Sequence, residues 1–268
     1  MSLFSNKKEK VYKLYLINKI MVQTYQYTRQ EFESFARAVK RASDMVRAKK
    51  PDFIFAPIIG AVPLIDLLSI ADRHFRIETT EYPPNSSRFS DREGIMNRWY
   101  SNFLHSNYVP GQRMSILCID EVISGSSAVK GYNEFRRALA QFGESRGERL
   151  ERRITYEILG FGEKPKGDKR NHGFSSLVNS KKARVLETDN IITSDNPLFN
   201  PIKLKVERST GNGRFIYKPE IEGFEYSEDY LNLLREFAEY FGRDPESTSP
   251  GNLIRIQESL SKYLKQNA

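Results

Sequence analysis

One stretch decides the fold of this chain: Met114-Ser-Ile-Leu-Cys-Ile-Asp-Glu-Val-Ile-Ser-Gly-Ser-Ser-Ala128. Residues 114–119 are almost continuously apolar, which is typical of a strand buried on both faces of a parallel sheet. Two carboxylates, Asp120 and Glu121, stand where that strand would end, and a loop of small residues, 124–127, follows them. The stretch therefore predicts a strand, an acid pair, a tight loop and the start of a helix.

The helix is indicated by apolar residues that recur at roughly helical spacing: Ala128, Tyr132, Phe135, Leu139 and Phe142. Backbone N–H groups at a helix N-terminus carry the positive end of the helix dipole, so a phosphate monoester can bind there without any lysine. Asp120 and Glu121 would then hold hydroxyl groups or a hydrated Mg²⁺ beside that phosphate. A sugar 5-phosphate with a free diol would bind both to the helix N-terminus and to the acid pair. The alternative interpretation is that Ser124 is only the N-cap of the helix.

Residues 116–127 resemble the phosphoribosyl pyrophosphate (PRPP) motif of type I phosphoribosyltransferases. In that motif four apolar residues precede two acids, two apolar residues and a Thr/Ser-Gly-x-Thr/Ser loop. With Asp120 and Glu121 on the acid pair, the loop of this chain is one residue shorter than the pattern. With the Ser-Gly pair aligned instead, Ile119 falls at the position of the first acid. We prefer the alignment that keeps both acids.

A second loop supports the same fold. Phe53-Ile-Phe-Ala56 predicts a short buried strand, and the helix expected after the loop 57–61 carries an apolar face of Leu64, Leu67, Leu68 and Ala71. The stretch Ile59-Gly-Ala-Val-Pro-Leu64 is similar to the pyrophosphate-binding loop of the same family, x-Gly-Gly-apolar-Pro-Leu, except that Ala61 replaces the second glycine. The resemblance implies that four residues bind pyrophosphate with Mg²⁺: Ile58, Ile59, Gly60 and Ala61.

Composition narrows the remaining possibilities. The chain of 268 residues is 39% hydrophobic and 28% charged, which fits a soluble globular protein. It has no apolar run of about 20 residues and no signal-peptide pattern, so we expect a cytoplasmic protein that does not cross a membrane. The formal charge of +8 suits an anionic partner, either a polyphosphate substrate or nucleic acid, of which we favour the first.

Cysteine and histidine usage excludes two chemistries. Cys118 is the only cysteine, so the chain forms no internal disulfide, and its place inside the apolar strand predicts a small buried hydrophobe. The three histidines lack zinc-site spacing. Any metal is therefore expected to be bound by oxygen.

The segments around these motifs predict further elements. Residues 1–27 form a basic, tyrosine-rich arm, and Thr28 with Glu31 forms a capping box that starts a helix ending near residue 50. Alternation predicts a strand over 76–82. The long polar loop that follows, residues 83–92, is a candidate lid. The resemblance implies that Arg88 and Arg92 close this lid over pyrophosphate, with Arg98 as a further candidate. The alternative interpretation is a solvated connector.

Beyond the PRPP-like helix, strands are expected over 154–161 and 183–188, with a basic, solvated loop over 163–173 between them. The segment 195–201 stands where the resembled family builds part of its base site, with Phe199 available to stack on the base. From residue 201 onward the composition changes to a hairpin and two amphipathic helices. This extension would cover the active site, form a dimer surface or bind another protein.

The sequence thus predicts an α/β fold, a parallel sheet flanked by helices over residues 28–200, with an arm (1–27) and an extension (201–268). The resemblance implies Mg²⁺-dependent transfer of phosphoribose from PRPP to a nitrogen acceptor, by default a nucleobase. The expected ligands of the 5-phosphate are Ser124, Gly125, Ser126 and Ser127, and the expected catalytic residues are Asp120, Glu121, Arg88 and Arg92. The alternative is a phosphoribosyltransferase-fold regulator that binds PRPP or a nucleotide without turnover and acts on nucleic acid or a partner protein.

Overall fold

The computed structural model describes residues 27–87, 89, 91–162, 171–189, 191–192, 202–211, 214–224, 226–248 and 253–264. Four predictions fall wholly or almost wholly outside these residues: the arm, the role of Arg88, most of the basic loop after residue 162, and the stacking role of Phe199. Within the described part, no helix is long and apolar enough to span a membrane.

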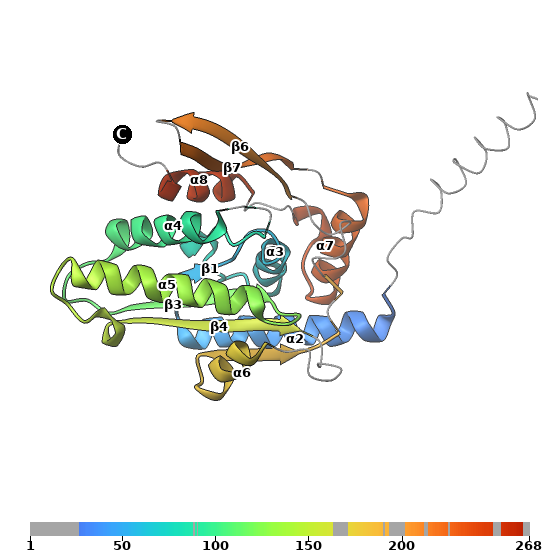
Figure 1. The fold of residues 1–268 in the computed structure, drawn as a ribbon. Helices are drawn as coiled ribbons and strands as arrows, with labels where there is room; N and C mark the ends of the chain where they lie inside the picture. Colours follow the sequence, from blue (N-terminus) through green and yellow to red (C-terminus); the bar gives the residue numbers. More distant parts are fainter. Residues whose placement is uncertain are drawn as a thin grey trace, which may run out of the picture.

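A five-stranded, all-parallel sheet forms the centre of the molecule (Figure 1). Its strand order is β2-β1-β3-β4-β5. The strands are β1 (Phe53–Phe55), β2 (Thr80–Glu81), β3 (Met114–Glu121), β4 (Ile154–Gly162) and β5 (Ala183–Glu187). The α/β class and the parallel sheet are therefore confirmed, and the arrangement is compatible with a Rossmann-like fold.

The strand order defines a switch point between β1 and β3. The chain runs from β1 out to β2 and then returns past β1 to place β3 on its other side. In open α/β sheets of this order, ligands bind in the crevice beyond the carboxyl ends of the two strands that flank the reversal. The topology alone thus points to the ends of β1 and β3.

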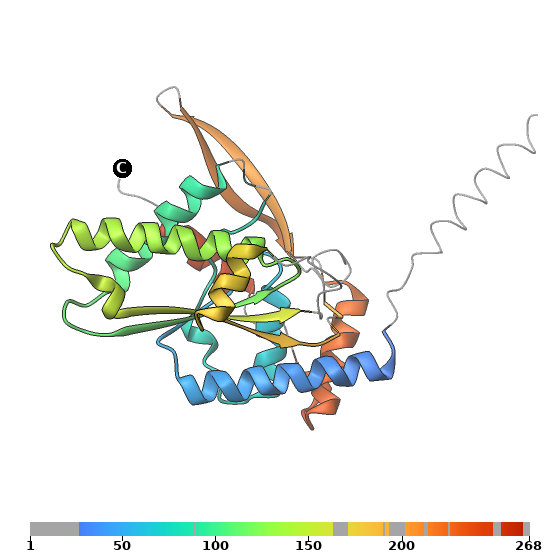
Figure 2. The same ribbon diagram turned by 60° about the horizontal axis from the view of Figure 1, so that its bottom comes forward.

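Helices cover both faces of the sheet (Figures 1 and 2). One buried cluster joins the sheet to α2 (Arg29–Lys49), α3 (Val62–Ala71) and α7 (Glu228–Tyr240). A second cluster joins the other face to α4 (Arg92–Asn107), α5 (Ser126–Glu144) and α6 (His172–Asn179). The last helix, α8 (Leu253–Leu264), lies against α4 and the edge strand β2.

The start of α2 follows the predicted capping box. The Glu31 amide donates to the Thr28 hydroxyl at 3.2 Å, and the Thr28 amide donates to the Glu31 carboxylate at 2.7 Å. Each bond satisfies a backbone donor at the helix end that would otherwise lack a partner. The predicted apolar face is buried throughout: Phe32, Phe35, Ala36, Val39, Ala42 and Val46.

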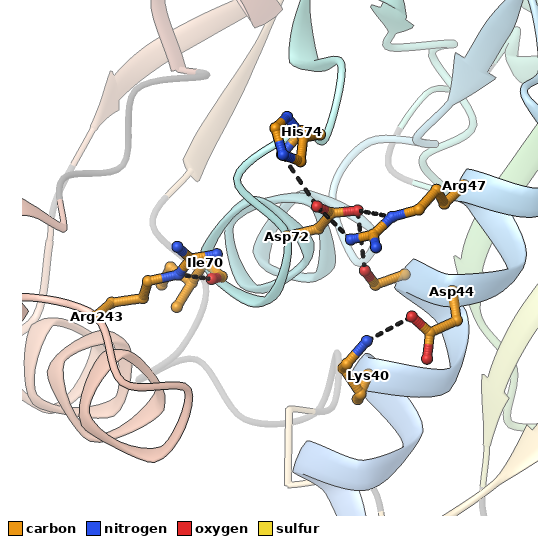
Figure 3. Close-up of polar contacts among 8 residues, drawn as sticks. Lys40, Asp44, Arg47, Ile70, Asp72, His74 and Arg243 are labelled. Atoms are coloured by element: carbon orange, nitrogen blue, oxygen red, sulfur yellow. Dashed lines mark hydrogen bonds and ion pairs between the residues drawn. The ribbon is translucent and has the colours of Figure 1, made fainter.

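Asp72 joins α2 to the end of α3 (Figure 3). One carboxylate oxygen of Asp72 lies 2.6 Å from a terminal nitrogen of Arg47 and also accepts a hydrogen bond from the His74 amide at 3.0 Å. The other oxygen accepts a hydrogen bond from Nε of Arg47 at 3.0 Å. Arg243, just after α7, donates from Nε to the Ile70 carbonyl at 3.1 Å (Figure 3). These bonds connect α2, α3 and the C-terminal extension.

The C-terminal extension contains the predicted hairpin and both predicted helices. Strands β6 (Ile202–Gly211) and β7 (Arg214–Phe224) pair antiparallel. Helices α7 and α8 contribute buried side chains to the core around the parallel sheet. The Tyr263 hydroxyl of α8 donates to Glu81 of β2 at 2.9 Å. Both helices therefore complete the core of the sheet.

Two local predictions are wrong. The strand expected over 76–82 is a short 3-10 helix, Ile77–Thr79, followed by the two residues of β2. The loop expected to form a lid over residues 83–92 is packed into the protein over residues 83–86, all of which are buried. It ends where Arg92 starts α4, a helix that we did not predict. The arginine expected on a moving lid is thus the first residue of a packed helix.

Candidate functional site

A cavity of about 390 Å³ lies at the switch point, beyond the carboxyl ends of β1 and β3. Four segments line it: 57–60, 85–87, 120–121 and 123–128. This volume is in the range of small-molecule sites in proteins, about 300–1,000 Å³. The two loops singled out by sequence, about sixty residues apart, therefore meet at one cavity together with the acid pair.

The loop after β3 turns at Gly125. This residue has a φ of +82° and is the N-cap of α5, and it has no side chain with which to cap the helix. A Cβ atom added to it would lie 2.3 Å from the ring of Phe174. Gly125 is therefore required both by its left-handed backbone and by the close approach of α6.

The first turn of α5 faces the cavity with its backbone donors. Ser126, Ser127 and Ala128 line the cavity, and the first amides of any α-helix have no partner within the helix. Ser124 is not the N-cap, although its hydroxyl accepts the Ser126 amide at 3.3 Å. An anion can bind amides of this turn because they lie at the positive end of the helix dipole.

The loop after β1 offers a second pair of amides. The Ile58 amide donates to the Pro83 carbonyl at 3.1 Å, and the Ala61 amide donates to the Pro57 carbonyl at 3.3 Å. Among the described residues, the amides of Ile59 and Gly60 have no acceptor. Ala61, which was expected to bind the ligand, is fully buried behind the loop as the N-cap of α3. Ala61 therefore does not line the cavity, and its role in binding pyrophosphate stays a prediction.

The two acids leave β3 on opposite faces of the sheet. Leu117 and Ile119 belong to the cluster around α2 and α3, whereas Cys118 belongs to the cluster around α4 and α5. Side chains alternate along a strand, so Asp120 follows Cys118 toward α4 and α5. Glu121 points the other way, and its Oε2 would lie 3.2 Å from a Cβ atom added to Gly60. The carboxylates thus stand at the cavity from two directions.

Asp120 is the most unusual polar group of the site. It is 6% exposed, its Oδ1 accepts the Glu121 amide at 2.9 Å, and its Oδ2 has no hydrogen-bond partner among the described residues. Burial raises the pKa of this carboxyl to about 8, and the charge of Glu121 adds to the rise. The amide hydrogen bond and the charge of Arg92 oppose it. A buried, unpaired carboxylate oxygen is costly, and because Asp120 lines the cavity, a ligand or cation bound there is a candidate partner for it.

The acid pair fits an Mg²⁺ ion bound together with a phosphate ligand. Within the described residues, no group of three or more His, Cys, Asp or Glu side chains could hold a metal alone. Mg²⁺ commonly takes only one or two protein carboxylates and completes its shell with water and substrate phosphates. Asp120 and Glu121 would supply those carboxylates, and the free Oδ2 of Asp120 is an oxygen donor of the required kind.

Some cavity residues were not predicted. Asn85, Ser86 and Ser87 form a further wall, and Ile123 is 59% exposed on the cavity surface. Residues 85–87 belong to the long polar segment 83–92, whose length suggested a functional loop, but no local pattern in it indicates that the segment packs inward. Arg92 is half-buried close to Asp120, and its Nε donates to Asn85 Oδ1 at 2.9 Å.

Comparison with known proteins found no matching family model and no matching curated protein. The functional argument therefore depends on the residues and geometry of the cavity.

Proposed function

We propose that this chain is a Mg²⁺-dependent phosphoribosyltransferase that transfers phosphoribose from PRPP to a nitrogen acceptor, with a nucleobase as the default acceptor. The observation that carries the proposal is the convergence of two amide-presenting loops and an acid pair with an unpaired oxygen at one cavity of about 390 Å³. The resemblance of both loops to the motifs of this enzyme family supports the same assignment.

Each part of the cavity matches one part of PRPP. Amides of residues 124–127 would bind the 5-phosphate, and amides of Ile59 and Gly60 would bind the pyrophosphate. Asp120 and Glu121 would bind the ribose diol and Mg²⁺, which when bound neutralises charge on the pyrophosphate. The exposed side chain of Ile123 offers an apolar contact for the ring of the acceptor.

The chemistry requires charge stabilisation and positioning. The bond between ribose C1 and the pyrophosphate oxygen breaks, the acceptor nitrogen forms a bond to C1, and the acceptor then loses a proton. Positive charge develops at the ribose ring in the transition state. The carboxylates of Asp120 and Glu121 stabilise that charge, while loop amides stabilise the charge on the leaving group.

A second candidate function is a non-catalytic regulator that binds PRPP or a nucleotide and acts on nucleic acid or a partner protein. It is favoured by the PRPP-like loop, which is one residue shorter than the family pattern, and by the overall charge of +8. A regulator on nucleic acid would show an electrophoretic shift that weakens steeply with salt, because phosphate contacts release counterions.

Pyrophosphate release separates the two functions. The protein is incubated with PRPP, Mg²⁺ and a panel of purine and pyrimidine bases, and pyrophosphate is measured over time. Release that depends on both Mg²⁺ and one base supports the enzyme. Binding of PRPP without release for any base, over a concentration range of protein, contradicts the enzyme and supports the regulator.

A further inference from the structure

Asn85 connects parts of the candidate site that lie far apart in the sequence. It is 5% exposed, and a buried amide side chain must find hydrogen-bond partners. Its Oδ1 accepts Nε of Arg92 at 2.9 Å, and its Nδ2 donates to the backbone carbonyl of Ser127 at 3.0 Å. One side chain therefore joins the start of α4 to the first turn of α5.

The contact with α5 depends on a glycine. Gly131 is a buried residue one turn after Ser127, and a Cβ atom added there would lie 3.3 Å from Nδ2 of Asn85. Glycine inside a helix costs about 0.5–1 kcal/mol relative to alanine. Helix α5 thus carries a residue that is unfavourable in helices, glycine, where the side chain of Asn85 contacts the helix backbone.

The hydrogen bond from Arg92 to Asn85 holds a positive charge near Asp120. The guanidinium group is half-buried, and its charge acts on Asp120. Asn85 is a neutral partner, so it fixes the orientation of Arg92 without cancelling its charge. The same amide therefore orients a positive charge beside the acid pair and fixes the turn that faces the ligand phosphate.

We propose that Asn85 is a positioning residue of this site: it holds the first turn of α5 and the guanidinium of Arg92 in the arrangement that receives an anionic ligand. The ligand part of this inference rests on the proposed function. The structural part does not, because it concerns how firmly residues 124–131 are held in the protein without ligand.

The test uses Asn85→Asp and a matched control, Asn102→Asp. The first variant keeps the shape and the acceptor for Arg92 but places an oxygen against the Ser127 carbonyl. Asn102 also donates from Nδ2 to a backbone carbonyl, that of Tyr263 at 2.8 Å, and it lies on α4 outside the cavity lining. Each variant thus loses the same kind of hydrogen bond, and only one loses it at the site.

Two measurements are made on both variants. Amide hydrogen exchange of the peptide covering 122–131 is expected to be at least fivefold faster in Asn85→Asp than in wild type and unchanged in Asn102→Asp. The dissociation constant for PRPP with Mg²⁺ is expected to rise at least tenfold in Asn85→Asp only. In Gly131→Ala the added methyl group displaces Asn85, and we expect a rise of about threefold.

The outcomes separate this inference from the proposed function. Unchanged exchange in Asn85→Asp overturns the positioning role, whether or not PRPP binds. Faster exchange with unchanged PRPP affinity also overturns it. Faster exchange in a protein whose wild type binds no PRPP supports the positioning role and contradicts the proposed function.

Discussion

Asp66 in α3 and Asp120 at the end of β3 are both almost fully enclosed, at 3% and 6% exposed. Burial raises the pKa of both carboxyls, to about 7 and about 8. Their partners differ. The Tyr230 hydroxyl of α7 donates to Asp66, whereas Oδ2 of Asp120 lacks any partner among the described residues, and Asp120 lines the candidate cavity. The first acid joins two helices, and the second lines the candidate ligand cavity.

This difference separates structural burial from functional burial. Each acid carries a desolvation cost, because burial disfavours the charged carboxylate. At Asp66 the protein offsets part of the cost with a hydrogen bond inside the core. At Asp120 the described residues offer no hydrogen bond to Oδ2, which leaves this oxygen for a partner from outside them.

The largest effect is expected at the acid pair. Asp120→Asn with Glu121→Gln should lower transfer activity by at least about 100-fold, because both groups that stabilise the developing charge are lost. The fold should remain intact, since the change relieves the repulsion between the two carboxyls. Pyrophosphate release and circular dichroism measure the two parts. Transfer near the wild-type rate would contradict the assigned role of the pair.

A smaller effect is expected from the pH dependence of Asp66. Its folded pKa, about 7, lies above the unfolded value of about 3.9, so its contribution to stability is complete below pH 4 and is lost as pH rises through 7. Asp66→Asn removes this titration and keeps an acceptor for Tyr230. The variant should gain about 2–3 kcal/mol over wild type between pH 5 and pH 8. Denaturation curves at both pH values test this, and parallel profiles would contradict it.

The smallest effect is expected from the hydroxyl of Tyr230. Tyr230→Phe keeps the buried ring and removes the donor to Asp66, which should lower the free energy of unfolding by about 1–3 kcal/mol at pH 8. Tyr240→Phe is the control, because Tyr240 also lies on α7 and packs against the rings of Phe32 and Phe241 but is 38% exposed. PRPP affinity should not change in either variant. Equal stability of Tyr230→Phe and wild type would show that Asp66 needs no partner.

Much of the fold was predictable because β1 and β3 are nearly continuous apolar runs, and because β4 and β5 concentrate aliphatic residues between polar segments. Helix α4 was missed although the signal was present, since its buried apolar residues recur in pairs every four positions: Ile95 and Met96, Trp99 and Tyr100, Phe103 and Leu104. Strand β2 was overestimated because an edge strand beside the three residues of β1 has little to pair with.

The two loops of the site could be predicted from the sequence, but the wall formed by residues 85–87 could not. Glycines and small residues after a strand have a local conformational reason, so Gly60 and Gly125 could be found in sequence. Side chains alternate between the two faces of a strand, so Asp120 and Glu121 point in opposite directions if β3 includes both residues. The sequence does not show that β3 extends to Glu121. The role of Asn85 depends on contacts with α4 and α5 that no local pattern records.

The most direct test of the central claim is the thermal midpoint with and without PRPP and Mg²⁺. A ligand that binds only the folded state stabilises it by about 2.7 kcal/mol at a hundredfold excess over its dissociation constant, a shift of several degrees. We predict this rise in wild type and in Ser176→Asp, a control on the exposed surface of α6. Ser126→Asp with Ser127→Asp should abolish it, because the new carboxylates repel the phosphate. An unchanged rise in that folded double variant would contradict the claim that this loop binds the 5-phosphate.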